Sequence, residues 1–269
     1  MKLSEAVKIL EAAGIDDARY DAVELFRAIG KMDRTALVFS DTECLSQELS
    51  EAIERRSRRE PLQYIIGEVD FYRESYRVTP DCLIPRQDTE ILVDYAVKNI
   101  PSGAHFLDLC TGSGCVAIST LKNTNKTTAT AVDVSREALS VAKFNAVKNG
   151  VSDRVDFLLA DVLREPVKED FFAILSNPPY VSKKDYGALQ KEIYFEPEIA
   201  FVGGEDGMLF YERITELYKD KISPDGFIAY EIGYDQADKV CAVAHKHSMR
   251  CEIIKDYSGN CRVAVLKNK

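Results

Sequence analysis

The sequence predicts an α/β protein with a doubly wound, mostly parallel sheet, preceded by a small helical domain. From about residue 88, short apolar strands alternate with helical stretches, the pattern of a parallel sheet covered by helices. The last two predicted strands are separated only by residues 256–260, which is too short for a crossover helix, so they must be antiparallel. Residues 1 to about 60 show helical periodicity without an intervening strand pattern.

The helical part begins with an apolar stripe at i, i+3, i+4 and i+7 spacing, formed by Leu3, Ala6, Val7 and Leu10. Asp16 or Asp17 can cap a second helix, which Gly30 ends. Ser46 can cap a third helix, which Pro61 ends. Aromatic and β-branched residues around a polar centre then predict a hairpin or extended linker. We therefore divide the chain into a helical domain (1–66), a linker (67–85) and an α/β domain (86–269).

The α/β domain contains a series of predicted strands and a well-defined helix between two of them. Ser135 can cap this helix, and Gly150 ends it. The predicted strands are residues 105–109, 128–132, 155–159, 173–176, 227–231, 251–255 and 261–266.

Composition restricts the possible classes of function. The chain has 269 residues, 46% of them hydrophobic, which is enough for a large core and excludes wholesale disorder. Its net charge of −9 means that contact with nucleic acid would require a local basic patch. No apolar run approaches a membrane span, and the amphipathic N-terminus is unlike a signal peptide. We expect a cytoplasmic protein without membrane contact.

The cysteines indicate a reducing compartment. They number seven, an odd count, and no CxxC pair occurs. The simplest interpretation is that all are reduced thiols packed as small hydrophobes. His245 and His247 have no CxxC partner, so we expect no metal site.

A glycine-rich turn follows the first strand of the α/β domain and opens a helix. Gly112-x-Gly114-x-x-Ala117 satisfies the dinucleotide fingerprint, and Asp133 follows 21 residues after Gly112. This match alone does not separate NAD from other nucleosides. In either case we expect Asp133 to accept hydrogen bonds from ribose hydroxyls.

Further acids at strand ends favour S-adenosyl-L-methionine. Asp108 would repel a pyrophosphate but suits the cationic end of that cofactor, although it can also serve as a helix cap or turn former. Asp161 is a candidate adenine contact beside Val162, or a plain helix cap. The predicted cofactor-binding residues are Asp108, Cys110, Thr111, Gly112, Ser113, Gly114, Asp133, Asp161, Val162 and Asn177.

Asn177-Pro178-Pro179-Tyr180 directly follows the fourth strand. Two prolines cannot continue strand pairing, so they form a rigid loop at the carboxyl edge of the sheet. The bland alternative is a tight turn without chemistry. The Asn177 side-chain oxygen and the Pro178 carbonyl can each accept one N–H bond from a planar NH₂ group. They would then direct its lone pair at a sulfonium methyl, while Tyr180 packs on its flat face.

Together these residues resemble the protein-(glutamine-N5) methyltransferases of peptide chain release factors, the HemK or PrmC family. The resemblance covers nearly the whole chain. Its motifs are Pro61-Leu62-Gln63-Tyr64-Ile65-Ile66-Gly67, Leu83-Ile84-Pro85-Arg86-Gln87-Asp88-Thr89-Glu90, Asp108-Leu109-Cys110-Thr111-Gly112-Ser113-Gly114, Asn177-Pro178-Pro179-Tyr180 and Gly203-Gly204-Glu205-Asp206-Gly207.

The resemblance implies a class I S-adenosylmethionine-dependent methyltransferase fold with seven strands, and an N-terminal domain that engages the release factor. It implies that the substrate is the glutamine of the release factor's Gly-Gly-Gln loop. Asp133 would hold the ribose, Asp161 and Val162 the adenine, and residues 177–180 the glutamine amide. We expect a monomer without stable nucleic-acid binding.

Two positions depart from the family pattern. Cys110 stands where glycine is usual, and a positive φ there would strain it. Gln87-Asp88 replaces Pro-Glu, and Asp88 can still cap a helix that starts near Ile91.

Three further features have two interpretations each. Arg55, Arg56, Arg58 and Arg59 form either a solvated helix end or a contact for the release factor or ribosomal RNA. Arg86 lines a substrate groove or forms a structural salt bridge. Residues 203–207 form a lid or a turn.

Other functions share parts of this pattern. A ribosomal-protein glutamine methyltransferase would use the same motif and mechanism. A DNA adenine or RNA guanine amino-methyltransferase would also suit Asn-Pro-Pro-Tyr, but the chain lacks an obvious basic DNA-reading domain. The intact motif argues against a non-enzymatic scaffold.

Overall fold

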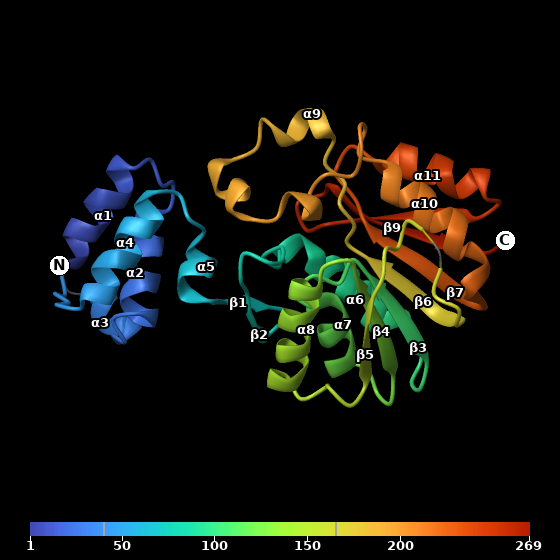
Figure 1. Cartoon of the computed structure of the whole chain (residues 1–269), viewed down its shortest axis with the longest axis horizontal. Coiled ribbons are helices and arrows are strands. Elements are labelled where there is room, and N and C mark those ends of the chain that lie inside the picture. The colour runs from blue at the N-terminus through green and yellow to red at the C-terminus, as the bar shows by residue number, and fades with distance from the viewer. Residues whose placement is uncertain (40, 165) are drawn as a thin grey trace. The chain divides into compact units, whose positions relative to one another are not determined.

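A computed structural model describes residues 1–39, 41–164 and 166–269 of the chain (Figure 1). The chain forms two compact units. The first comprises Met1–Glu68 together with Gln190–Phe195, and the second comprises Val69–Leu189 and Glu196–Lys269. The segment 190–195 therefore belongs to the helical unit, although the chain on both sides of it belongs to the larger unit.

The first unit is helical and packs around its own apolar core, which includes Leu10, Leu25 and Phe26. Ser46 caps α4 as predicted, since its hydroxyl accepts from the Leu49 amide at 3.2 Å. Asp17 precedes α2 but makes no side-chain cap. The helices are α1 (Leu3–Ala12), α2 (Ala18–Ala28), α3 (Arg34–Phe39), α4 (Gln47–Ser57), α5 (Leu62–Ile66) and the short 3-10 helix η2 (Lys191–Phe195).

Two of these helices, α3 and α5, are absent from the sequence-based prediction because both are too short to show periodicity. The predicted end of the third helix at Pro61 is wrong. α4 ends at Ser57, and Pro61 instead begins α5. Proline suits this position because it needs no amide donor there.

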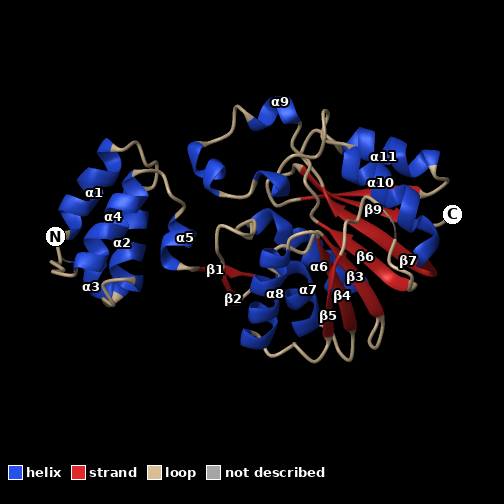
Figure 2. Ribbon diagram, in the orientation of Figure 1, coloured by secondary structure: helices blue, strands red, loops and turns tan. Residues whose placement is uncertain are grey.

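Of the two forms expected after the helical domain, a hairpin or an extended linker, the structure has the hairpin, which is formed by β1 (Glu68–Phe71) and β2 (Glu74–Arg77). The seven-stranded sheet follows, in the order β5-β4-β3-β6-β7-β9-β8. Figure 2 shows its strands in red. Its strands are β3 (His105–Leu109), β4 (Thr128–Asp133), β5 (Val155–Leu159), β6 (Phe171–Ser176), β7 (Ile222–Glu231), β8 (Arg250–Lys255) and β9 (Cys261–Lys267). Neighbours from β5 to β7 pair in parallel, whereas β9 pairs antiparallel with both β7 and β8, which confirms the predicted architecture.

Helices cover both faces of this sheet, and the strands alternate their side chains between two cores. Phe106 joins the core beneath α6, α7 and α8, whereas Leu107 and Leu109 join the core beneath α10 and α11. The helices are α6 (Glu90–Asn99), α7 (Cys115–Lys122), α8 (Arg136–Lys148), α9 (Lys183–Tyr186), α10 (Leu209–Tyr218) and α11 (Ala237–Lys246), with the 3-10 helices η1 (Gln87–Thr89), η3 (Glu198–Ala200) and η4 (Lys219–Lys221). In the described part of the chain, no helix has the length and apolarity needed to cross a membrane.

The expectation that all seven cysteines are reduced is wrong for one pair in this structure. Cys241 of α11 and Cys251 of β8 form a disulfide. Because α11 packs beside β8, the two Cα atoms lie 5.3 Å apart, within the range that a disulfide spans. The other five cysteines form no disulfide.

Candidate functional site

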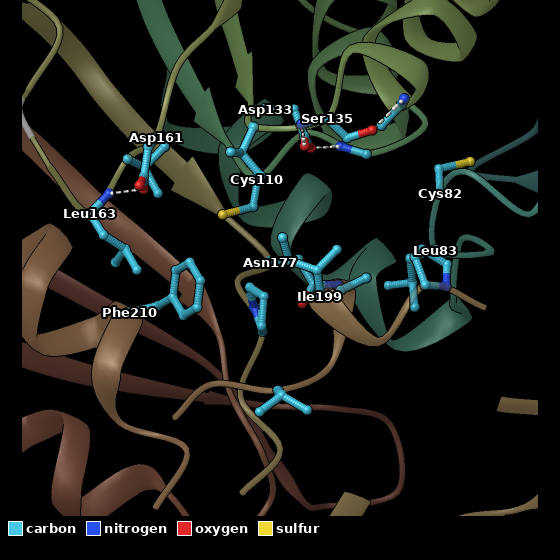
Figure 3. A pocket seen from close by; sticks show the side chains of 18 of the residues that line it. Cys82, Leu83, Cys110, Asp133, Ser135, Asp161, Leu163, Asn177, Ile199 and Phe210 are labelled. Carbon is cyan, nitrogen blue, oxygen red and sulfur yellow. Dashed lines mark hydrogen bonds between the residues drawn. The ribbon is translucent and has the colours of Figure 1, made fainter. Parts of the chain in front are cut away.

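A cavity of about 330 Å³ lies at the carboxyl ends of β3, β4, β5 and β6, the edge where sheets of this kind bind ligands. Asp133 and Asp161 lie along one side with Cys110 between them, and Leu83 and Ile199 lie across from them (Figure 3). Of the predicted site residues, the cavity is lined by Cys110, Gly112, Asp133, Asp161, Val162, Asn177 and Pro179. Asp108, Thr111, Ser113, Gly114, Pro178, Tyr180 and Arg86 are not among its lining residues.

The glycine-rich turn has three residues in the left-handed region. Cys110, Gly112 and Gly114 have φ values of 61°, 55° and 82°. At Gly114 a Cβ atom would lie 2.9 Å from Ile118 Cδ1, so glycine is also needed there for close packing. The strain predicted at Cys110 is therefore real, since a non-glycine residue pays for this conformation. Burial raises the pKa of its thiol, which keeps the sulfur protonated.

Asp108 is fully buried behind the turn. Its Oδ2 accepts from the Thr111 hydroxyl at 2.6 Å and from the Ala117 amide at 3.2 Å, so it fastens the turn to the start of α7. Its Oδ1 has no hydrogen-bond partner among the residues that the structure describes. Burial raises the pKa of this carboxyl to about 7, against hydrogen bonds that lower it.

Asp133 lies at the end of β4, where both of its oxygens already contact backbone. Oδ2 accepts from the Gly112 amide at 2.8 Å and Oδ1 from the Ser135 amide at 2.9 Å. Each carboxylate oxygen has a further lone pair for a ligand. Burial raises the pKa of Asp133, although these amide bonds oppose the shift.

Asp161 and Val162 follow β5 and form a second wall of the cavity. Asp161 Oδ1 accepts from the Leu163 amide at 3.0 Å, and Oδ2 accepts from Arg164 Nε at 3.0 Å. Asp161 therefore stabilises the local turn and also faces the cavity.

The Asn177–Pro178–Pro179–Tyr180 segment leaves β6 against two glycines. A Cβ at Gly203 would lie 2.3 Å from the Pro179 carbonyl oxygen, and one at Gly207 would lie 2.3 Å from the Tyr180 carbonyl oxygen. The Gly203 amide also donates to the Val181 carbonyl at 2.9 Å. The segment 203–207 is thus packed and hydrogen-bonded against the chain that carries the Asn-Pro-Pro-Tyr motif.

Two segments of the chain match known domains. Residues 2–67 match the PrmC N-terminal domain, and residues 87–196 match the Methyltransferase small domain. A protein of Thermodesulfovibrio yellowstonii named release factor glutamine methyltransferase is 38% identical over 257 residues, which cover 92% of this chain and 91% of that protein. The chain belongs to the release factor glutamine methyltransferase family.

Other members of the release factor glutamine methyltransferase family show similar agreement. The Geobacter sulfurreducens protein of that name is 37% identical over 86% of this chain and 82% of its own length. The fold recurs in a solved methyltransferase from Pyrococcus furiosus, with a TM-score of 0.53 and 20% identity over 72% of this chain and 89% of that chain. The chain is thus a methyltransferase with a class I fold, as predicted.

The four arginines of the basic cluster predicted in this family member all have acidic partners within the chain. Arg56 is buried and donates to Asp21 at 2.6 Å and to Glu192 at 3.3 Å. Arg59 donates to the same Glu192 at 3.1 Å. Arg55 pairs with Glu60, and Arg58 with Glu54. These contacts agree with a structural role for the cluster.

Arg86 forms an ion pair with the buried Glu196, which also accepts from the Ile84 amide at 2.9 Å. The predicted cap at Asp88 is wrong. A 3-10 turn precedes α6, which starts at Glu90, and Asp88 instead pairs with Arg262 at 3.0 Å. Arg262 lies in β9, far from Asp88 in the sequence, so the local sequence around Asp88 cannot predict this ion pair.

Sequence reasoning missed several buried polar residues that hold the site. Asn145 of α8 accepts from the Arg77 amide at 2.8 Å and donates to the Ser113 carbonyl at 2.9 Å, so it ties the hairpin to the glycine turn. An asparagine within an otherwise apolar helical stripe was the available signal. Thr89, Glu231 and Gln236 lie behind residues 177–180, and no sequence pattern marked them.

Proposed function

We propose that this chain transfers a methyl group from S-adenosyl-L-methionine to the side-chain amide nitrogen of the glutamine in the Gly-Gly-Gln loop of peptide chain release factors. The observation that carries the proposal is the meeting of Asn177 and Pro179 with Asp133 at one cavity. Direct methyl transfer requires the methyl acceptor and the nucleoside cofactor to bind in the same cavity. The names of the relatives, which are similar over nearly the whole chain, support the choice of substrate.

The residues present fit this cofactor. When bound, it supplies a methyl group activated on a positively charged sulfur. Asp133 would hold the ribose hydroxyls, and Asp161 with Val162 would hold the adenine. The acidic lining favours a cationic ligand and disfavours the pyrophosphate of a dinucleotide. Asp108 lies behind the glycine-rich turn and does not line the cavity, so its carboxyl would favour the cationic end of the cofactor through charge and not through direct contact.

The acceptor chemistry rests on Asn177 and Pro178. An amide nitrogen is a poor nucleophile because its lone pair is delocalised. The Asn177 Oδ1 and the Pro178 carbonyl would accept the two N–H bonds of the substrate amide, orient its nitrogen and stabilise the positive charge that develops. A nitrogen–carbon bond forms, the sulfur–carbon bond breaks, and the nitrogen then releases one proton to water. Because the proton becomes acidic only during transfer, no strong base is required beforehand.

The test is transfer of labelled methyl to purified release factor, ribosomal protein and nucleic acid in parallel, with mass spectrometry of the labelled residue. We expect label on the glutamine of the release factor. Asn177→Ala should reduce the rate roughly 100- to 1,000-fold, because it removes an acceptor aimed at the reacting group. Asn99→Ala, at an exposed helix end, is the control and should keep the wild-type rate. Label on nucleic acid alone would overturn the proposal.

A further inference from the structure

The turn that follows β5 forms part of the cavity wall at the edge of the sheet. β5 is an edge strand and pairs with β4 on its inner side. Residues 161–163 of the turn line the cavity, where they are proposed to meet the adenine of the cofactor. A loop with few neighbours opens easily unless another element holds it. The contacts that hold this turn therefore bear on cofactor binding.

Bonds within the turn involve its amide groups. The Leu163 amide donates to Asp161 Oδ1 at 3.0 Å (Figure 3). The Arg164 amide donates to the Asp161 carbonyl at 3.1 Å. These bonds set the local shape of the turn, but they do not involve the carbonyl groups of Leu163 and Arg164.

Those two carbonyls accept from one arginine of α10. Arg213 Nε donates to the Leu163 carbonyl at 2.8 Å, and Arg213 Nη2 donates to the Arg164 carbonyl at 3.2 Å. The planar guanidinium presents its N–H groups in a fixed geometry, which suits two successive carbonyls. On its other side, Nη1 donates to Glu216 Oε2 at 2.7 Å. Arg213 thus bridges α10 and the turn.

The same helix contributes directly to the cavity. Phe210 precedes Arg213 by three residues, so the two side chains project from the same side of α10. Phe210 and Leu163 both line the cavity and pack against the same apolar core (Figure 3). Arg213 itself is not among the lining residues. The helix therefore supplies one part of the cavity wall with Phe210 and holds another part through Arg213.

We propose that Arg213 is a positioning residue for cofactor binding: it fixes the turn 161–164 to α10 and so keeps Val162 and Leu163 in the wall that receives the adenine. This inference rests on the proposed function, because it takes S-adenosylmethionine as the ligand. Arg213 touches neither the cofactor nor the reacting atoms. A wall that contacts only the adenine stabilises the bound cofactor and the transition state equally, so Arg213 sets cofactor affinity and not the rate of transfer.

Calorimetry with S-adenosylhomocysteine, the product that methyl transfer leaves, measures this wall without a methyl acceptor. Arg213→Met keeps an unbranched side chain but removes both bonds to the turn, so Kd should rise roughly 10-fold. Arg213→Lys keeps the charge without the planar set of donors, so its Kd should rise by a smaller factor. A wild-type Kd in Arg213→Met would overturn the inference.

Glu216→Gln is the matched control for the calorimetry. It removes the exposed ion pair of Arg213 but leaves both bonds to the turn, so Kd should stay within about twofold. Amide hydrogen exchange provides a second readout, which needs no ligand. The Leu163 and Arg164 amides should exchange faster in Arg213→Met than in the wild type, and at the wild-type rate in Glu216→Gln. Unchanged exchange of both amides in Arg213→Met would contradict the inference.

Steady-state kinetics of the full chain with release factor separate positioning from a general structural effect. In Arg213→Met the KM for S-adenosylmethionine should rise roughly 10-fold, while kcat at saturating cofactor stays within about twofold. A lower kcat with an unchanged KM would overturn the inference. If the wild type binds S-adenosylhomocysteine but methylates no release factor, the proposed substrate fails, and the calorimetry still decides the role of Arg213. If methylation occurs and Arg213→Met binds like the wild type, the inference about Arg213 fails alone.

Discussion

Cys110 combines a side chain with a backbone conformation that favours glycine. Its φ of 61° falls in the left-handed region, where a Cβ atom crowds the following carbonyl. Cys110 also lines the cavity, so the strained backbone lies in the wall of the candidate site.

The strain can be measured with two substitutions that both remove the thiol. We expect Cys110→Gly to have a free energy of unfolding about 1 kcal/mol higher than Cys110→Ala, since only glycine removes the Cβ. Urea denaturation of both variants gives this difference. Comparing them with each other cancels the lost sulfur contacts, and equal stabilities would contradict the strain.

Residues at the end of a strand could be predicted from the sequence more readily than contacts between distant parts of the chain. The position of Asn177 and Asp133 at the cavity was predictable because each directly follows a predicted strand. The position of Thr89 was not, since its partner Asn177 is 88 residues away. Asp88 was misread for the same reason, because Arg262 reaches it from the far end of the sequence.

Helix α8 carries a buried amide, Asn145, that bonds two neighbouring segments of the chain. Asn145 is fully buried, and it bonds both the amide and the carbonyl of Arg77 in β2, at 2.8 and 3.0 Å. It also bonds the carbonyl of Ser113 in the glycine-rich turn. One side chain thus positions a hairpin and a turn against the same helix.

We expect Asn145→Ala to lower the free energy of unfolding by about 3 kcal/mol, because it leaves several buried backbone groups without partners. Asn149→Ala is the matched control on this helix. Asn149 is only half-buried and bonds the Ser75 carbonyl at 3.2 Å, so its loss should cost about 1 kcal/mol. Urea unfolding measures both, and similar losses would refute the central role of Asn145.

The bounds of strands that consist of a continuous apolar run could be predicted from the sequence, whereas the bounds of other strands could not. The strands at residues 105–109 and 155–159 match β3 and β5 without any shift. Strand β7 starts at Ile222, five residues before the predicted start at 227, because Pro224 and Gly226 resemble a turn. The strand continues through them with an irregular register against β6.

The helical unit is assembled from two distant parts of the chain. Glu192 contributes to it by accepting from Arg56 and Arg59. Burial would raise the pKa of Glu192, but backbone and arginine hydrogen bonds outweigh this and lower it. The alternation of strands and helices predicted the two kinds of domain, but no local pattern could reveal that residues 190–195 join the helical one.

Glu192→Lys places a cation beside two arginines. We expect amide hydrogen exchange in residues 190–195 to accelerate roughly tenfold, equivalent to about 1.4 kcal/mol lost from the local opening free energy. Exchange in the seven-stranded sheet should not change. Glu198→Lys, at an exposed position, makes the same charge change as a control. Equal acceleration in both variants would show that the ion pairs do not hold the segment.

The order of strands in the sheet also affects how the protein emerges during synthesis. β9 follows β8 in the sequence but lies between β7 and β8. Residues 227–231 of β7 pair with residues 263–267, so this apolar strand keeps an open edge on the ribosome until β9 has left the exit tunnel. Open strand edges attract other chains. The nascent protein therefore passes through a stage at which shielding by a chaperone would matter most, and that stage ends only when β9 is inserted.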